Sequence, residues 1–158
     1  ITNMRGTVKN RNIPGPDHRY DSEKVSKFIN YIMERGKKNT ARTVLYGVLD
    51  DIKEKDKKDP LEVFEKALKN ASPQMEVRSR RIGGANYQVP REVRPERQLA
   101  LSMRWILEAA KSKKGSPIRK RLYDEIIAAS NNEGDAVKKK ENVHKMAEAN
   151  RAFAHFAF

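Results

Sequence analysis

Residues 75–93 read MEVRSRRIGGANYQVPREV, and they form the segment of this chain that alternates as β-strands do. Over residues 75–82, apolar or small side chains alternate with charged ones, which is the period of a strand. A pair of glycines follows, and apolar residues then recur at even spacing. Two short strands joined by a glycine turn predict a β-hairpin at about residues 75–93. Pro90 has no N–H to donate, so we expect the second strand to be an edge strand or to be interrupted there.

Helical periodicity lies on both sides of the hairpin. Apolar residues spaced three and four apart predict helices at about residues 25–33, 44–52, 61–71, 99–110, 118–129 and 137–147. Asp21 or Ser22 can cap the first helix, and the Asp59-Pro60 pair is typical of a helix start. The predicted fold is mainly α, a bundle of about six helices with one protruding β-hairpin. The hairpin tip has few large side chains, so we predict that it is an appendage.

The chain divides into an arm and one domain. Residues 1–20 contain basic residues, glycine and proline with little apolar content, which predicts an extended basic arm that becomes ordered on RNA. Residues 21–158 are predicted to form a single helical domain, and the total of 158 residues is typical of one domain. No apolar run approaches the roughly 18 residues of a membrane span, so an integral membrane protein is excluded.

The composition indicates a polyanionic partner. The chain has 34 basic and 21 acidic residues, a net charge of +13, and no cysteine. The lack of cysteine excludes a disulfide scaffold, a thiol nucleophile and a cysteine zinc site. Residues 50–65 hold seven acids and four bases and net −3, so the remainder nets +16. This uneven charge favours one solvated side and one basic docking face.

Three clusters carry the basic charge. Between Glu76 and Arg97 there are six arginines and no lysine, and arginine binds phosphate with two parallel hydrogen bonds. The others are the run of lysines and arginines at 111–121 and the lysines at 138–145. Arg104 extends this surface or pairs with Glu108 one turn later. Tyr87 either stacks on an RNA base or packs at the hairpin base, and packing is the interpretation that we favour.

No group of residues points to catalysis. His144 and His155 lie eleven residues apart without a third metal ligand beside them, and the glycine pair lacks the lysine of a phosphate-binding loop. Carboxylates such as Asp124 and Glu125 lie among charges typical of a solvated helix face. The sequence therefore predicts a non-enzyme without cofactor, metal or small-molecule substrate. A basic DNA-architectural protein and an enzyme acting on RNA remain as alternatives to an RNA-binding structural protein.

Two blocks resemble one known family. Residues 79–90 and 92–97, SRRIGGANYQVP and EVRPER, look like the hairpin signature of small-subunit ribosomal protein seven, bacterial type. Residues 144–155, HKMAEANRAFAH, resemble its C-terminal block, and KFIN at 27–30 and DPLEVF at 59–64 match too. The resemblance covers nearly the whole chain from about Met4. The ending Phe156-Ala157-Phe158 departs from the Arg-Trp ending common among relatives.

The resemblance implies a structural protein of the cytoplasmic ribosome. It implies binding to the 3′ major domain of small-subunit ribosomal RNA, nucleation of head assembly, and contacts with neighbouring head and platform proteins. It also implies a hairpin near the exit-site transfer RNA and the mRNA exit path. Family members can repress translation of their own operon mRNA.

The resemblance also implies two groups of site residues. The ribosomal RNA contacts are expected at Arg5, Lys9, Arg11, Arg78, Arg80, Arg81, Arg94, Arg97, Arg104, Lys111, Lys113, Lys114, Arg119, Lys138 and Lys139. The hairpin tip, expected near the exit-site transfer RNA, consists of Ile82, Gly83, Gly84, Ala85 and Asn86.

Overall fold

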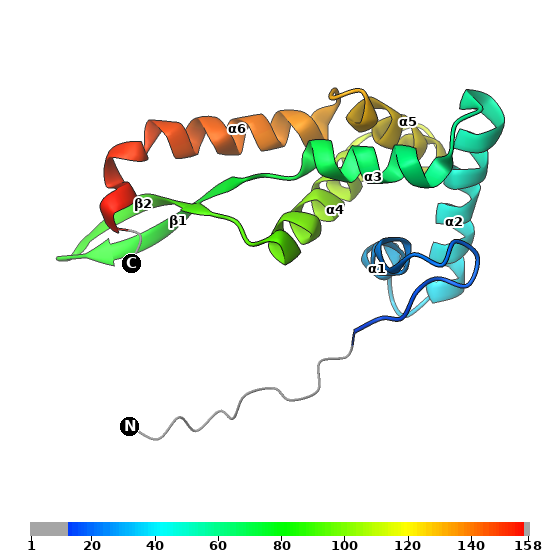
Figure 1. The fold of residues 1–158 in the computed structure, drawn as a ribbon, viewed down its shortest axis with the longest axis horizontal. Coiled ribbons are helices and arrows are strands. Elements are labelled where there is room, and N and C mark those ends of the chain that lie inside the picture. Colours follow the sequence, from blue (N-terminus) through cyan, green and yellow to red (C-terminus); the bar gives the residue numbers. More distant parts are fainter. Residues whose placement is uncertain (1–12, 157–158) are drawn as a thin grey trace, which may run out of the picture.

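The computed structural model describes residues 13–156 (Figure 1). Among them are six α-helices, α1 (Glu23–Ile32), α2 (Lys38–Asp51), α3 (Pro60–Ala71), α4 (Pro95–Ser112), α5 (Ile118–Ser130) and α6 (Asp135–Ala149). The strands β1 (Met75–Ile82) and β2 (Ala85–Glu92) lie between α3 and α4. A π-helical turn η1 (Ile52–Asp56) extends α2, and a 3-10 helix η2 (Arg151–Phe156) follows α6. This arrangement confirms the predicted fold class.

Two predicted helix starts carry the expected capping bonds. The Ser22 hydroxyl accepts a hydrogen bond from the Val25 N–H at 3.5 Å, ahead of α1. The Asp59 carboxylate accepts one from the Leu61 N–H at 3.0 Å, and Pro60 occupies the first turn of α3. Both bonds satisfy N–H groups that have no partner inside the helix. The caps therefore fix where α1 and α3 begin.

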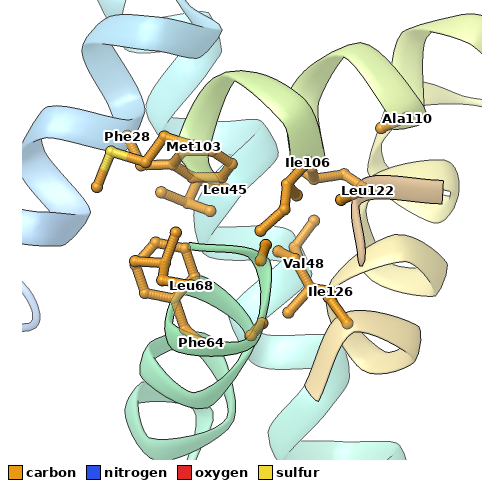
Figure 2. Close-up of a cluster of buried hydrophobic side chains, with 14 of the residues drawn as sticks. Phe28, Leu45, Val48, Phe64, Leu68, Met103, Ile106, Ala110, Leu122 and Ile126 are labelled. Carbon is orange, nitrogen blue, oxygen red and sulfur yellow. The ribbon is translucent and has the colours of Figure 1, made fainter. Parts of the chain in front are cut away.

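The hydrophobic core lies where the helices meet (Figure 2), and α6 adds Ala136 and Val137 to it. Each of α1 to α5 contributes buried side chains to it, namely Phe28, Leu45, Val48, Phe64, Leu68, Met103, Ile106, Ala110, Leu122 and Ile126. The rings of Phe28 and Phe64 are 5.3 Å apart in a tilted arrangement, which is favourable for aromatic pairs. The apolar stripes predicted on these helices are thus the faces that they bury.

The hairpin has the predicted glycine turn. Strand β1 pairs antiparallel with β2, with Ile82 opposite Ala85, so only Gly83 and Gly84 form the turn. Both glycines have positive φ, +56° and +88°, which a type I′ turn requires and side chains disfavour. Pro90 does not interrupt β2, because both strands of a two-stranded sheet are edge strands.

The hairpin projects at the opposite end of the molecule from α1 and α2 (Figure 1). It is not a free appendage, however, because α6 lies along it and η2 folds back onto β2. The tip residues Gly83–Asn86 are exposed, as expected, while Tyr87 is half-buried. The hairpin is therefore supported along its length up to the tip.

Part of the predicted arm lies against the helices. Asp17 is buried, and its carboxylate accepts hydrogen bonds from the Tyr46 hydroxyl of α2 at 2.7 Å and from the Arg19 N–H at 3.1 Å. The Arg19 guanidinium forms a bidentate pair with Asp50 at the end of α2. The predicted contacts Arg5, Lys9 and Arg11 lie outside the described residues.

Candidate nucleic-acid interface

The hairpin and its root carry a group of exposed arginines, Arg78, Arg81, Arg91 and Arg94, called here the hairpin arginines. Within residues 13–156, none of the four makes an ion pair or a side-chain hydrogen bond. Three of them, Arg78, Arg91 and Arg94, line a hollow of about 430 Å³ at the hairpin root together with Arg97, Val77, Glu76 and Glu92. Arginines outnumber carboxylates in this hollow, which suits it to an anion such as phosphate.

A line of cations continues from the hairpin root along α4. Arg97, Arg104 and Lys111 are spaced seven residues apart, so they lie on one face of that helix. All three are exposed. The Arg104 guanidinium is 5.7 Å from the centre of the Tyr31 ring, and Lys111 pairs with Glu34 just beyond α1. This α4 stripe runs beside α1.

The lysines of α6 approach the same helix. Lys139 pairs with Glu108 of α4, and its ammonium is 5.9 Å from the centre of the Trp105 ring. Glu108 is therefore engaged by Lys139, and no bond joins it to Arg104, which was the alternative in the sequence. Lys138 is more exposed and lies 3.7 Å from Asp135 in the same helix. The third basic cluster is thus joined to the α4 stripe.

Most carboxylates near this surface are engaged with its cations. Arg97 holds Glu76 through its Nε, at 2.8 Å from one oxygen and 3.0 Å from the other. The hydrogen bond and charge of Lys111 lower the pKa of Glu34. Exposed ion pairs of this kind contribute little to stability, so their cations can exchange a carboxylate for a phosphate. The pairing also reduces the free positive charge of the α4 stripe compared with that of the hairpin arginines.

Lys113 occupies a different environment. Its ammonium bonds the carboxylate of Glu125 at 2.7 Å, and the Glu125 side chain is fully buried. This bond raises the pKa of Lys113. The second oxygen of Glu125 accepts the N–H of Ala136, the second residue of α6, at 3.0 Å. Lys113 therefore ties the loop after α4 to the start of α6, while its neighbour Lys114 is exposed and has no ion pair among residues 13–156.

The placement of Glu125 corrects one sequence interpretation. Asp124 is exposed, as a solvated helix face predicts, but Glu125 is buried. The signal was its spacing, because Glu125 follows Leu122 by three residues and precedes Ala129 by four, both of them on the buried face of α5.

Arg119 lies apart from the α4 stripe. It forms a bidentate pair with Asp51 at 2.8 and 2.9 Å and packs over Gly47 of α2. The hydrogen bond to Asp51 raises the pKa of Arg119, and the same bond lowers the pKa of Asp51. Of the predicted RNA-binding residues within residues 13–156, Arg119 is thus the one whose ion pair is with a residue of α2.

Arg80 and Tyr87 contact the C-terminal segment. The two residues lie opposite each other in the hairpin register. Tyr87 packs between Phe153 and Phe156, with ring centres 5.3 Å from each, so the favoured packing interpretation holds, although the partner is η2. An Arg80 Nη1–H donates to the Phe156 carbonyl at 2.5 Å.

The described residues contain no cluster of three or more potential metal ligands among histidine, cysteine, aspartate and glutamate. None of the helices within residues 13–156 is long and apolar enough to cross a membrane.

Comparison with known proteins agrees with this arrangement. A family model described as ribosomal protein S7p/S5e matches residues 3–151. The small ribosomal subunit protein uS7 of Thermotoga petrophila is 56% identical over 146 residues, which are 92% of this chain and 94% of that protein. The protein of the same name from Chloroflexus aggregans is 55% identical over 152 residues, 96% of each chain. That from Marinobacter nauticus is 53% identical over 143 residues, 90% of this chain and 92% of its own. The chain therefore belongs to the ribosomal protein S7p/S5e family of structural, non-enzymatic proteins of the small ribosomal subunit.

Proposed function

We propose that this protein binds small-subunit ribosomal RNA through the hairpin arginines and the α4 stripe. The observation that carries the proposal is the group of four exposed arginines that have no ion pair or side-chain hydrogen bond within residues 13–156. Unpaired cations gathered on one hairpin and its root repel one another, and phosphate groups relieve that repulsion. Membership of a family of small-subunit ribosomal proteins supports ribosomal RNA as the source of those phosphates.

The hairpin arginines and the α4 stripe contribute differently to binding. The hairpin arginines contact phosphates directly and release condensed counterions, which makes the affinity depend on salt. Arg97 and Lys111 of the α4 stripe first give up a carboxylate partner, so each of these two cations adds less. Specificity then comes from the shape of a folded RNA junction, since arginines on a helix and a ribbon need phosphates at fixed positions.

The assembly role follows from the same surface. The protein binds the 3′ major domain and nucleates the head of the subunit in the cytoplasmic ribosome, beside other head and platform proteins. The exposed tip at Gly83–Asn86 then lies near the exit-site transfer RNA and the mRNA exit path. Repression of its own operon mRNA would use the same arginines, because the protein has one such exposed group among its described residues.

A pair of charge-reversal variants tests the RNA-binding surface. Arg78→Glu with Arg81→Glu removes two hairpin arginines, whereas Lys57→Glu with Lys58→Glu makes the same charge change in the acidic 50–65 segment. Affinity for the 3′ major domain RNA is measured at several salt concentrations, with circular dichroism as the check on folding. The arginine variant should reduce the slope of log affinity against log salt by about 1.4 to 1.8, from roughly 0.7 to 0.9 per phosphate contact.

The lysine variant is the matched control and should leave the slope nearly unchanged. Equal losses in both variants would show that binding follows overall charge and would contradict the proposed surface. Competition with duplex DNA distinguishes the proposed function from that of a DNA-architectural protein. An RNA-binding protein should release the folded RNA only weakly when duplex DNA is added. Displacement by DNA at equal concentration would favour that alternative.

A further inference from the structure

A two-stranded ribbon is marginally stable on its own in water. In this protein the ribbon nevertheless has a defined course, and the buried residues Val89 and Val93 lie in the half nearer its root, as the strand register shows. The part that carries Arg80, Arg81 and Tyr87 needs another source of order. The contacts of the C-terminal segment, residues 144–156, supply one.

The first contact is at the hairpin root. The Gln74 N–H donates to the His144 Nε2 atom of α6 at 3.0 Å, and the Gln74 carbonyl accepts the Val93 N–H at 2.9 Å. A single residue, Gln74, thus closes the two ends of the hairpin through its carbonyl and joins them to α6 through its N–H. The bond requires an unprotonated Nε2. Burial, and then the nearby Lys140, lower the pKa of His144, which favours the neutral ring that this bond needs.

The second contact is farther out along the hairpin. The ring of Tyr87 on β2 packs against Phe153 and Phe156, and the latter two rings are nearly parallel at 6.3 Å. Across the ribbon, Arg80 of β1 bonds the carbonyl of Phe156. Both strands are therefore held by the same turn of η2, which Figure 1 shows folded onto the hairpin.

We propose that residues 144–156 are a brace that fixes the direction of the hairpin before RNA binds. Two contacts separated along a ribbon, at Gln74 and at Tyr87, determine where it points, while either one alone leaves it free to swing. His144, Phe153 and Phe156 are accordingly positioning residues for the hairpin arginines.

The brace assigns different roles to neighbouring arginines. Arg80 is held by the brace, whereas Arg78 and Arg81 have no partner within residues 13–156 and remain available to phosphate. Holding these two in place in advance reduces the conformational entropy lost on binding. This consequence rests on the proposed RNA-binding function, whereas the brace itself does not.

The absence of cysteine from the sequence makes a direct test practical. Spin labels are attached at Asn86→Cys on the tip and at Lys66→Cys on the exposed face of α3, and their distance distribution is measured in the free protein. Phe153→Ala with Phe156→Ala removes the aromatic part of the outer contact, and Tyr87→Phe is the matched control that keeps the ring. We expect the distribution to widen at least twofold in the double alanine variant and to stay unchanged in the control.

RNA affinity of the unlabelled variants is the second readout. The double alanine variant should bind the 3′ major domain RNA about tenfold more weakly than the control, with its thermal transition nearly unchanged because Phe153 and Phe156 lie outside the core. A distribution that stays narrow in the double variant overturns the brace. A wide distribution with unchanged affinity overturns its role in binding. If the unaltered protein fails to bind this RNA while the distribution still widens, the proposed function fails and the brace stands.

Discussion

Replacing Glu125 tests how the loop that carries Lys113 is held against α5 and α6. Its side chain is fully buried, with one oxygen on the Ala136 N–H at 3.0 Å and the other on the Lys113 ammonium at 2.7 Å. Glu125→Ala leaves a buried N–H without an acceptor, at about 1–3 kcal/mol. The space left by the carboxyl group adds roughly 1 kcal/mol. The loss of the ion pair with Lys113 adds little to this cost, because the Lys113 side chain is 39% exposed and its ammonium can be hydrated instead. The expected loss is therefore about 2–4 kcal/mol.

Two further variants separate the hydrogen bond from the charge. Glu125→Gln keeps an acceptor of the same shape for the Ala136 N–H and loses only the charge, so we expect about 1 kcal/mol. Lys113→Met removes the cation and leaves a buried carboxylate with one N–H donor. We expect the free energy of unfolding to fall by about 2–3 kcal/mol. This loss is smaller than the usual one for a broken buried pair, because Lys113 is partly exposed. Combining Lys113→Met with Glu125→Gln should recover part of that loss.

The assay is chemical denaturation followed by circular dichroism at pH 7, with the free energy of unfolding extrapolated to water. The informative comparison is Lys113→Met with and without Glu125→Gln. If the double variant is less stable than Lys113→Met alone, the carboxylate is not balanced by Lys113 and the reasoning is refuted. A loss below 1 kcal/mol for Glu125→Ala would refute the assigned role of the Ala136 hydrogen bond.

Two other predictions concern α2 and its neighbours. In Gly47→Ala the new Cβ would lie 2.7 Å from the Arg119 Nε, the far end of a flexible side chain, so Arg119 should move away from Asp51. The free energy of unfolding should not fall, because alanine is favoured over glycine inside a helix by about 1 kcal/mol. The pKa of Asp51, measured by NMR, should rise toward its ordinary value, and an unchanged value would contradict the displacement. Burial, with the hydrogen bond to Asp56, raises the pKa of Tyr123 to about 12. The stability that this shift contributes is complete below about pH 10, the ordinary tyrosine pKa, and is lost as pH rises through about 12. Tyr123→Phe should abolish that part of the pH dependence, and an alkaline titration of unfolding that is the same in both proteins would count against it.

The sequence predicted the helices and the hairpin well, because their signals are local. Apolar spacing gave the buried faces of α1 to α5, and the Gly83-Gly84 pair gave the turn of the hairpin. The same spacing places Glu125 on the buried face of α5, but its charge favoured the interpretation that it is exposed to solvent. The partner that makes its burial acceptable is Lys113, in a loop twelve residues earlier.

The candidate site was predicted less completely, since it depends on contacts between distant residues. The sequence identified the cations but could not tell which would meet carboxylates, as Lys111 meets Glu34 from 77 residues away. It also could not place the aromatic residues of η2 on Tyr87, because nothing local encodes the return of the chain to the hairpin. Arg80 has a partner in η2 and Arg81 has none there, and this difference arises only because the chain returns to the hairpin.

Helix α4 acts as a spacer of fixed length between the two basic ends of the surface. It runs unbroken for 18 residues, which is about 27 Å at 1.5 Å per residue. Arg94 precedes its first residue, and Lys114 lies two residues after its last. Any RNA that contacts both must present two phosphates at roughly that separation, whatever bases lie between them. An unfolded strand meets this requirement only transiently, whereas a folded junction meets it permanently. Under the proposed function, a spacer of this length favours binding to RNA that has already adopted its tertiary structure.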